Sequence, residues 1–319
     1  MIRVLMPDLA KMFFSRVVQG ILALLTISLL IFLLLHQVGG DALMAMHGES
    51  SISEEAIAGL RHIYGLDRSV MERYLDWLYE AVQGQFGYSF YYQVPVANII
   101  WRRLLNTAAL AGVALVIAWS FAVTLGIVAA RRAGTWIDHV CNLIVLIGSS
   151  TPHLVLALGV LTFAAHTIGM TVGGPTQGLS ASSWFLRLLP PALVLCVPLV
   201  ALFLSQTRAS VGMALNQEFV RVARAKGLPE KIILFRHVLR PALTPLITIF
   251  GYALGGLMSG SVIVEKVMGW PGLGELSVIA VLSRDVPLLM GVALVTATMV
   301  LAFNLLADIL FRLNDPRQR

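Results

Sequence analysis

The chain has 319 residues, of which 58% are hydrophobic and only 13% are charged, and its mean hydropathy is +0.83. A composition this apolar excludes an ordinary soluble domain and indicates a polytopic membrane protein. The net charge of +6 would suggest a nucleic-acid partner in a soluble protein. In a membrane protein, basic residues gather on cytoplasmic loops, so we expect no nucleic acid.

Six apolar stretches are each long enough to cross a hydrocarbon layer about 30 Å thick. Each is expected to be a helix, because backbone groups in lipid must be hydrogen-bonded within their own segment. We therefore predict an all-α membrane protein whose residues 1–319 form a single transmembrane domain. The expected spans are residues 13–36, 104–130, 138–168, 186–207, 242–264 and 287–311. The first is too long for a usual cleaved signal peptide, so we expect it to be retained.

The distribution of basic residues predicts the orientation. With the N-terminus inside and six spans, 15 of the 23 Lys and Arg residues fall in inside segments and 8 fall in the longer outside segments. Cytoplasmic segments carry this excess, so we expect both termini in the cytoplasm. Arg102 and Arg103, at the outer mouth of the second span, run against the rule.

The first outside loop, about 37–101, is the only sizeable polar segment outside the membrane on that side. SISEEAIAGLRHIYGL (51–66) and RYLDWLYEAVQGQFGYSF (73–90) carry apolar residues at helical spacing. They predict short amphipathic helices that lie on the membrane or cap the bundle.

The predicted spans have no Asp, Glu, Lys or Arg near their middles. Such residues mark proton and ion pathways, so an ion-coupled carrier is disfavoured. His153, Gln206 and Asn304 are the polar candidates to line a path, although packing between helices explains His153 more simply. The sequence has no phosphate-binding loop and no protease or hydrolase motif, so we expect no enzyme. Any uphill transport must draw its energy from a partner.

One strip differs from the rest of the chain. Residues 218–241 hold six Lys or Arg and two Glu. Their apolar positions recur every three or four residues, and Gly227 and Pro229 break the segment into two short helices. Three interpretations are a helix pair on anionic lipid, a DNA-binding helix-turn-helix, and a docking site for a cytoplasmic protein. Small residues at 223, 225 and 227 favour insertion into a groove of a partner.

The strip also resembles a known family. VRVARAKGL (220–228) followed by RHVLRPALTPLI (236–247) is similar to the cytoplasmic loop of permeases in ABC importers, in the dipeptide, oligopeptide and nickel branch. In the general motif Glu-Ala-Ala-x-x-x-Gly, the aligned residues here are Arg221, Val222, Ala223 and Gly227, so the Glu and the first Ala are replaced. Further segments resemble the family in order along nearly the whole chain: 34–42, 64–78, 86–90, 149–161, 264–276, 284–292 and 303–317.

The resemblance, closest to the first of the two permease subunits, implies a bacterial inner-membrane permease that imports di- or oligopeptides or a related small solute. Its implied partners are a second permease, two cytoplasmic ATPases that hold ATP and Mg, and a periplasmic or lipid-anchored substrate-binding protein. The chain itself is expected to hold no cofactor or metal. The strip, within a coupling loop 208–241, would contact the ATPases through Glu218, Arg221, Ala223, Arg224, Lys226, Gly227 and Leu228.

Alternatives remain at this stage. The same type of complex imports nickel or a metal chelate in part of the family. A membrane scaffold or an ion-coupled carrier is an alternative of another class.

The segment MGWPGLGEL (268–276) lies outside the membrane in this topology. By resemblance, Asp41, Trp270, Pro271, Gly272 and Gly274 would line the periplasmic mouth or contact the binding protein. A turn built on Trp270-Pro271-Gly272 and packed against the bundle is an equally good interpretation.

Overall fold

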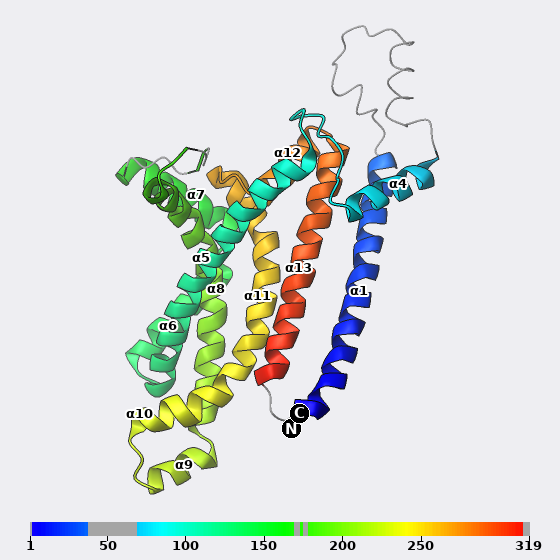
Figure 1. Ribbon diagram of the computed structural model, residues 1–319. Helices are drawn as coiled ribbons and strands as arrows, with labels where there is room; N and C mark the ends of the chain where they lie inside the picture. The colour runs from blue at the N-terminus through cyan, green and yellow to red at the C-terminus, as the bar shows by residue number, and fades with distance from the viewer. Residues whose placement is uncertain (1, 38–68, 169–172, 175–177, 315–319) are drawn as a thin grey trace, which may run out of the picture. The chain divides into compact units, whose positions relative to one another are not determined.

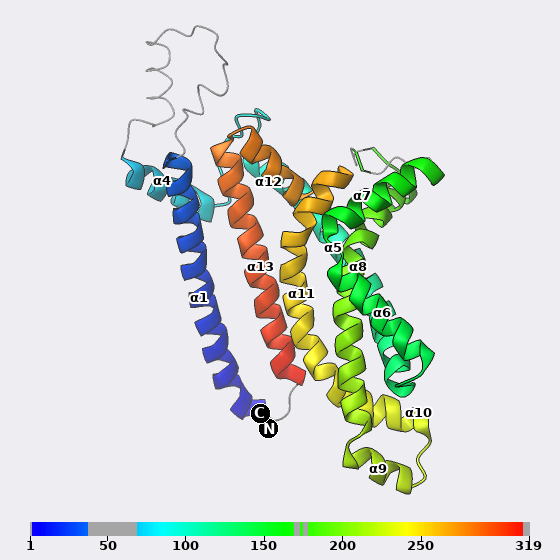
Figure 2. The ribbon, with the colours of Figure 1, turned by 180° about the vertical axis from the view of Figure 1, so that it is seen from behind.

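The computed structural model describes residues 2–37, 69–168, 173–174 and 178–314 (Figures 1 and 2). In these ranges the regular structure is helical apart from one isolated bridge between Tyr88 and Pro95, which confirms the predicted all-α class. The helices are α1 Ile2–Gln37, α4 Val70–Val82, α5 Val96–Arg131, α6 Trp136–Ser150, α7 His153–Phe163, α8 Ala181–Leu215, α9 Glu218–Ala225, α10 Glu230–Ile232, α11 Leu239–Met268, α12 Leu273–Leu282 and α13 Val286–Asn314. Asp41 and the predicted helix within 51–66 lie outside the described residues.

Five helices in the described part of the chain are long and apolar enough to cross a membrane, or six if the pair α6–α7 forms one span. The expected ranges 104–130, 186–207, 242–264 and 287–311 each lie within one helix. The expected range 138–168 does not, because α6 and α7 meet at a bend of 102°. Pro152 lies at this bend and forces the residue before it, Thr151, into an extended conformation.

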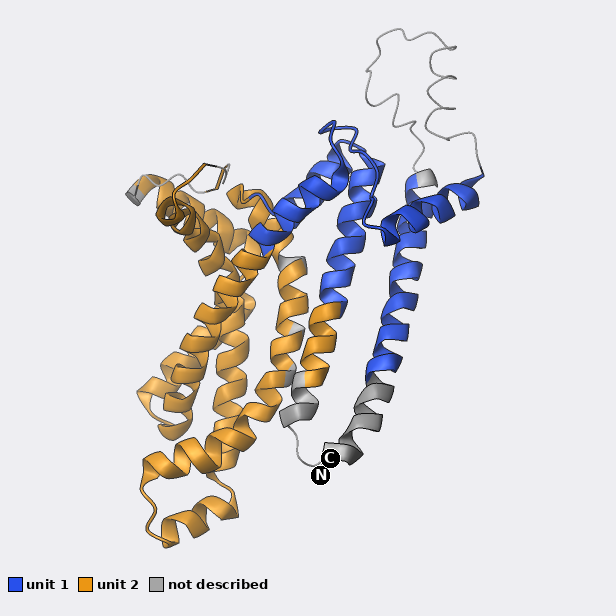
Figure 3. Ribbon diagram, viewed as in Figure 1, with its two compact units in different colours: residues 1–107, 271–301 blue, residues 108–270, 302–319 orange. Residues whose placement is uncertain are grey.

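The chain divides into two compact units, residues 1–107 with 271–301 and residues 108–270 with 302–319 (Figure 3). They are called unit 1 and unit 2.

Helix α8 is the centre of unit 2, where α6, α7 and α11 pack against it. Glycines allow the closest approaches: a Cβ added to Gly126 would lie 2.6 Å from the Thr207 Cβ, and one added to Gly148 would lie 3.0 Å from the Ala201 Cβ. Small residues at helix crossings are typical of membrane bundles, where tight packing replaces the hydrophobic effect as the driving force. Trp119 of α5 joins the helices further, with its ring edge-on to those of Phe203 and Phe250 at 5.2 and 5.4 Å.

This packing predicts different effects for two glycines of the same helix. We expect Gly126→Ala to lower the stability of the protein by about 1–3 kcal/mol, because the new methyl group overlaps α8. Gly112→Ala is the matched control, since no atom lies within 4 Å of a Cβ at that position. Thermal unfolding in detergent measures both. Equal melting temperatures for the two variants would contradict the packing described here.

In unit 1, the beginning of α5 packs against α12 and the first turns of α13. The buried core of this contact contains Val96, Ile100, Leu273, Leu276, Ala280, Leu288 and Val292. The buried carboxylate of Asp285 caps α13 by accepting from the Leu288 N–H at 3.1 Å, and it also accepts from Ser89 Oγ and the Tyr91 N–H. One acidic side chain thus attaches the segment before α5 to the start of α13.

Candidate functional site

The charged strip forms a separate feature between α8 and α11, where both views show α9 and α10 side by side beyond the end of α8 (Figures 1 and 2). Helix α9 is followed by α10, which continues through the π-helical segment η2, Ile233–Val238, into α11. The strip is therefore continuous at its C-terminal end with a long apolar helix. The backbone of α10 and η2 therefore links any movement of α9 to a movement of α11.

The end of α9 is set by Gly227. This residue has φ of +76°, a left-handed conformation that favours glycine. Its N–H donates to the Arg224 carbonyl at 2.9 Å, and the Leu228 N–H donates to the Ala223 carbonyl at 3.3 Å. These two bonds form the Schellman motif that closes many helices. The break predicted from Gly227 and Pro229 is present, and Pro229 is the residue immediately before α10.

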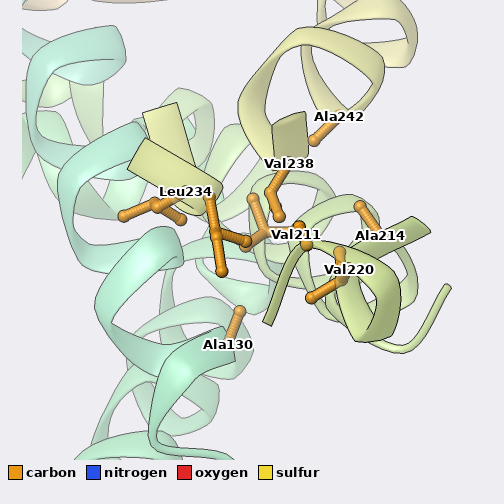
Figure 4. Close-up of a cluster of buried hydrophobic side chains, with 9 residues drawn as sticks. Ala130, Val211, Ala214, Val220, Leu234, Val238 and Ala242 are labelled. Carbon is orange, nitrogen blue, oxygen red and sulfur yellow. The ribbon is translucent and has the colours of Figure 1, made fainter. Parts of the chain in front are cut away.

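A buried apolar cluster holds α9 in place (Figure 4). Val220 and Ala223 of α9 pack with residues of α5, α8, η2 and α11, and Leu228 packs against the edge. The buried members are Ala130, Val211, Ala214, Val220, Ala223, Ile233, Leu234, Val238 and Ala242. Because one buried core joins α9 to α5, α8 and α11, the inner face of α9 is packed against these helices.

This core gives Ala223 a different role from the ATPase contact that the resemblance implied. Its small side chain is 6% exposed and contacts the chain's own core, so it positions α9. The exposed face of α9 carries Phe219 and Val222, which are 41% and 52% exposed. Glu218, Arg221, Arg224, Lys226 and Gly227 are also exposed, while Leu228 is half-buried. The sequence pattern identified the apolar positions but could not say which of them face outward.

An ion pair braces the two short helices. Arg224 Nε of α9 donates to Glu230 Oε1 of α10 at 2.7 Å across the Gly227 turn. The hydrogen bond to Glu230 holds the pKa of the Arg224 guanidinium above its ordinary value. Both side chains are about half exposed, so the pair contributes little to stability and links α9 to α10 across the Gly227 turn.

A second ion pair, which the sequence did not predict, lies at the same end of unit 2. Arg208 of α8 donates from Nη2 to Asp138 Oδ2 at 2.8 Å, and its Nε donates to Oδ1. Asp138 also accepts from the Gly134 N–H and stands in the first turn of α6, where the helix dipole favours a negative charge. This bidentate bond ties α6 and the turn before it to α8, which leads into α9.

Gly227 gives a test of the turn geometry. No atom lies within 4 Å of a Cβ at this position, so a substitution there is limited by backbone strain alone. We expect Gly227→Asn to retain most activity, since Asn tolerates the left-handed region, and Gly227→Val to lose several-fold more because β-branched residues do not. Transport activity at matched expression measures the difference. Equal activities would show that the turn is not required in this form.

The segment 268–276 is a packed turn in the structure. In unit 2, α11 ends at Gly269 in the left-handed conformation, the Gly174 N–H donates to the Gly269 carbonyl at 2.9 Å, and the buried Trp270 ring packs edge-on against Trp184. These contacts bury the indole, so Trp270 holds the end of α11 in place.

In unit 1, residues 271–275 are held to α5 by hydrogen bonds and an ion pair. Asn106 Nδ2 donates to the Pro271 carbonyl and the Leu273 N–H donates to Thr107 Oγ1, both at 2.8 Å. Arg103 pairs with Glu275, which explains a basic residue at this end of the span. Gly272 and Gly274 are buried. The segment therefore positions α12 through its backbone.

The three candidate path residues lie on separate helices of unit 2. His153 is half-buried at the start of α7, just after the 102° bend. Gln206 of α8 donates to Ser210 Oγ one turn later, at 3.2 Å. Asn304 is half-buried on α13. That these three residues line a transport path stays a prediction.

Comparison with known proteins identifies the relatives of this arrangement. Residues 122–319 match the family described as "Binding-protein-dependent transport system inner membrane component", and residues 9–111 match the corresponding N-terminal family. The oligopeptide transport system permease protein AppB of Bacillus subtilis is 34% identical over 314 residues, which are 97% of this chain and 99% of AppB. A relative from Brucella suis biovar 1 is 35% identical over 308 residues, covering 95% of this chain and 97% of its own.

A solved structure shares the fold. A chain of the inward-facing MetNI methionine ABC transporter superposes with a TM-score of 0.57 at 17% identity. It covers 68% of this chain and 96% of its own length.

Proposed function

Because this chain belongs to the family of inner membrane components of binding-protein-dependent transport systems, we propose that it is the permease subunit of an ABC importer for di- or oligopeptides. It is a multi-pass membrane protein that works with an ATPase and a substrate-binding protein. The substrate class rests on the oligopeptide permease AppB, to which the chain is similar over nearly its full length. The chain itself hydrolyses no ATP in this proposal.

One observation carries the proposed mechanism: α9 presents an apolar patch while its inner face is built into the bundle. Phe219 and Val222 are exposed on a helix whose Val220 is fully buried against α8 and α11. Exposed aromatic residues such as Phe219 are typical anchors in pockets of a partner. An ATPase that binds this face and closes on ATP would move α9, and the shared core would pass that movement to α8 and α11.

The polar residues around the patch have separate parts. Glu218, Arg221 and Lys226 are exposed and would surround the apolar contact, as charged rims do in transient interfaces. Arg221 replaces the acidic residue of the general importer motif, so we propose that its ATPase partner carries complementary acidic groups. Arg224 is already paired with Glu230 across the turn.

The remaining subunits and the orientation follow from the same proposal. We place both termini and α9 in the cytoplasm because most of the basic residues then lie inside. One copy pairs with a second permease, two ATPases bind below, and a periplasmic or lipid-anchored binding protein delivers substrate. At the periplasmic mouth, Trp270, Pro271, Gly272 and Gly274 act by fixing α11 and α12. Asp41 remains a candidate contact for the binding protein.

Reconstitution of the complete transporter tests this function. Vesicles that contain this chain, its second permease, the ATPases and the binding protein are expected to accumulate a labelled tri- to pentapeptide only when ATP is inside the compartment that holds the ATPases. Uptake of nickel or a metal chelate in place of peptide would show that the peptide substrate is wrong. The assignment of the chain to an ATP-driven importer would still hold. Binding of a cytoplasmic protein without any ATP-dependent uptake would support a scaffold instead, and uptake driven by an ion gradient alone would indicate a carrier.

A further inference from the structure

Helix α4 lies across the last third of α1 in unit 1, as both views show (Figures 1 and 2). Tyr74 makes the deepest contact: its Oη lies 2.9 Å from Ser28 Oγ and 3.3 Å from the Leu25 carbonyl oxygen. The Tyr74 ring packs against Phe32 at 5.5 Å, and Trp77 and Leu78 add to the same apolar cluster.

The level of this contact places α4 relative to a membrane. The apolar span of α1 runs from Phe13 to Leu35. Ser28 comes seven residues before the end of that span, which is about 10 Å along a helix that rises 1.5 Å per residue. A tyrosine side chain reaches about two-thirds of that distance, so the axis of α4 lies at or below the level where the apolar span ends.

The part of α4 that does not touch α1 is divided lengthwise into two strips. Met71, Leu75, Tyr79 and Val82 are 58%, 54%, 73% and 83% exposed and lie on one side of the helix. Glu72, Asp76 and Glu80 are exposed at the same four-residue spacing, about 100° further round the helix. One helix thus presents an apolar strip and an acidic strip along its whole length.

We propose that α4 is embedded in the outer leaflet, with the strip of Met71, Leu75, Tyr79 and Val82 in the acyl chains and the acidic strip facing the aqueous layer. A helix of segregated polarity at this depth is typical of interfacial insertion. The acidic strip excludes attraction to anionic lipids as the driving force, so burial of the apolar side chains holds the helix. The packing of Tyr74 on Ser28 then fixes the outer end of α1 at the membrane surface.

Neighbouring residues of the two strips provide the test. Leu75→Cys and Asp76→Cys, each labelled with a nitroxide, are compared in the full chain and in the assembled transporter, in phosphatidylethanolamine–phosphatidylglycerol vesicles. The native cysteines, Cys141 and Cys196, are both buried, so the unsubstituted chain serves as the labelling blank. We expect the ratio of oxygen to nickel-complex accessibility to be at least about threefold higher at position 75 than at 76, because oxygen partitions into lipid and the nickel complex into water.

Two outcomes would overturn the proposal. Shielding of position 75 from both reagents would show that another protein surface covers the strip. High nickel-complex accessibility at 75 would show that the strip is in water. Tyr79→Cys and Glu80→Cys repeat the comparison one turn later, so the result does not depend on one variant. None of these measurements requires transport activity, so insertion of α4 in the membrane is tested apart from the proposed function. Only the assignment to the outer leaflet rests on the orientation in that proposal.

Discussion

Phe219→Ala is expected to reduce ATP-dependent peptide uptake by about ten- to thirtyfold while the permease still inserts and assembles normally in the membrane. The ring is 41% exposed on α9, one turn from Val222, and it is not one of the buried residues of the core beneath. Truncating an aromatic anchor in a protein interface typically removes about 2 kcal/mol or more of binding energy. Uptake and ATP hydrolysis are measured together in reconstituted vesicles, and both should fall.

Trp136→Ala is the matched control. Trp136 is also a large exposed aromatic residue, 73% exposed, and it begins α6 at the same end of unit 2 without belonging to α9. We expect its truncation to leave uptake within about twofold of the native protein, since isolated surface residues contribute little. If Phe219→Ala transports as well as Trp136→Ala, this face of α9 is not where the ATPase binds.

Asp138→Ala is the second change with a large expected effect. The substitution removes the carboxylate that accepts hydrogen bonds from Nε and Nη2 of Arg208. It also removes the acceptor of the Gly134 N–H. Loss of one partner from a buried pair costs about 3–5 kcal/mol. Because Arg208 is one-third exposed, we expect about 2 kcal/mol and a melting temperature about 5 °C lower. Uptake should fall as well, since α6 and α8 are no longer tied together where α8 leads into α9.

Arg208→Lys separates geometry from charge in this pair. Lysine keeps the positive charge but has no planar fork for two parallel bonds, so we expect a smaller loss of stability than with Asp138→Ala. A melting temperature unchanged in both variants would mean that the pair contributes nothing, as is common for ion pairs in water. Thermal unfolding in detergent and uptake in vesicles distinguish these outcomes.

The sequence predicted features that depend on local pattern. Long apolar runs predict helices because lipid leaves the backbone no other partner. The structure places one helix at five of the six predicted runs, and α6 and α7 share the sixth. The end of α9 was predicted equally well, because Gly227 and Pro229 act through their own backbone restrictions. Membership of the importer family was also predicted correctly from ordered short motifs.

Features that depend on distant residues could not be read from the sequence. Asp138 and Arg208 are 70 positions apart, and the only signal was one acidic and one basic residue at the ends of two apolar spans. The inward position of Ala223 depends on how α9 packs against α5 and α8. Helix α12, Leu273–Leu282, was missed because a mostly apolar segment of ten residues after a glycine-rich turn is too short for a span. Pro152 allows a bend between α6 and α7, but a proline in the sequence does not set an angle of 102°.

We propose that a cytoplasmic ATPase binds the exposed face of α9. Cross-linking from Val222→Cys in the assembled transporter, with a short thiol-reactive reagent, tests it most directly, because Val222 is exposed beside Phe219 while the native Cys141 and Cys196 are buried. We expect a covalent adduct between this chain and an ATPase subunit, formed faster than from Trp136→Cys. Absence of that adduct from a transporter that still imports peptide would contradict it.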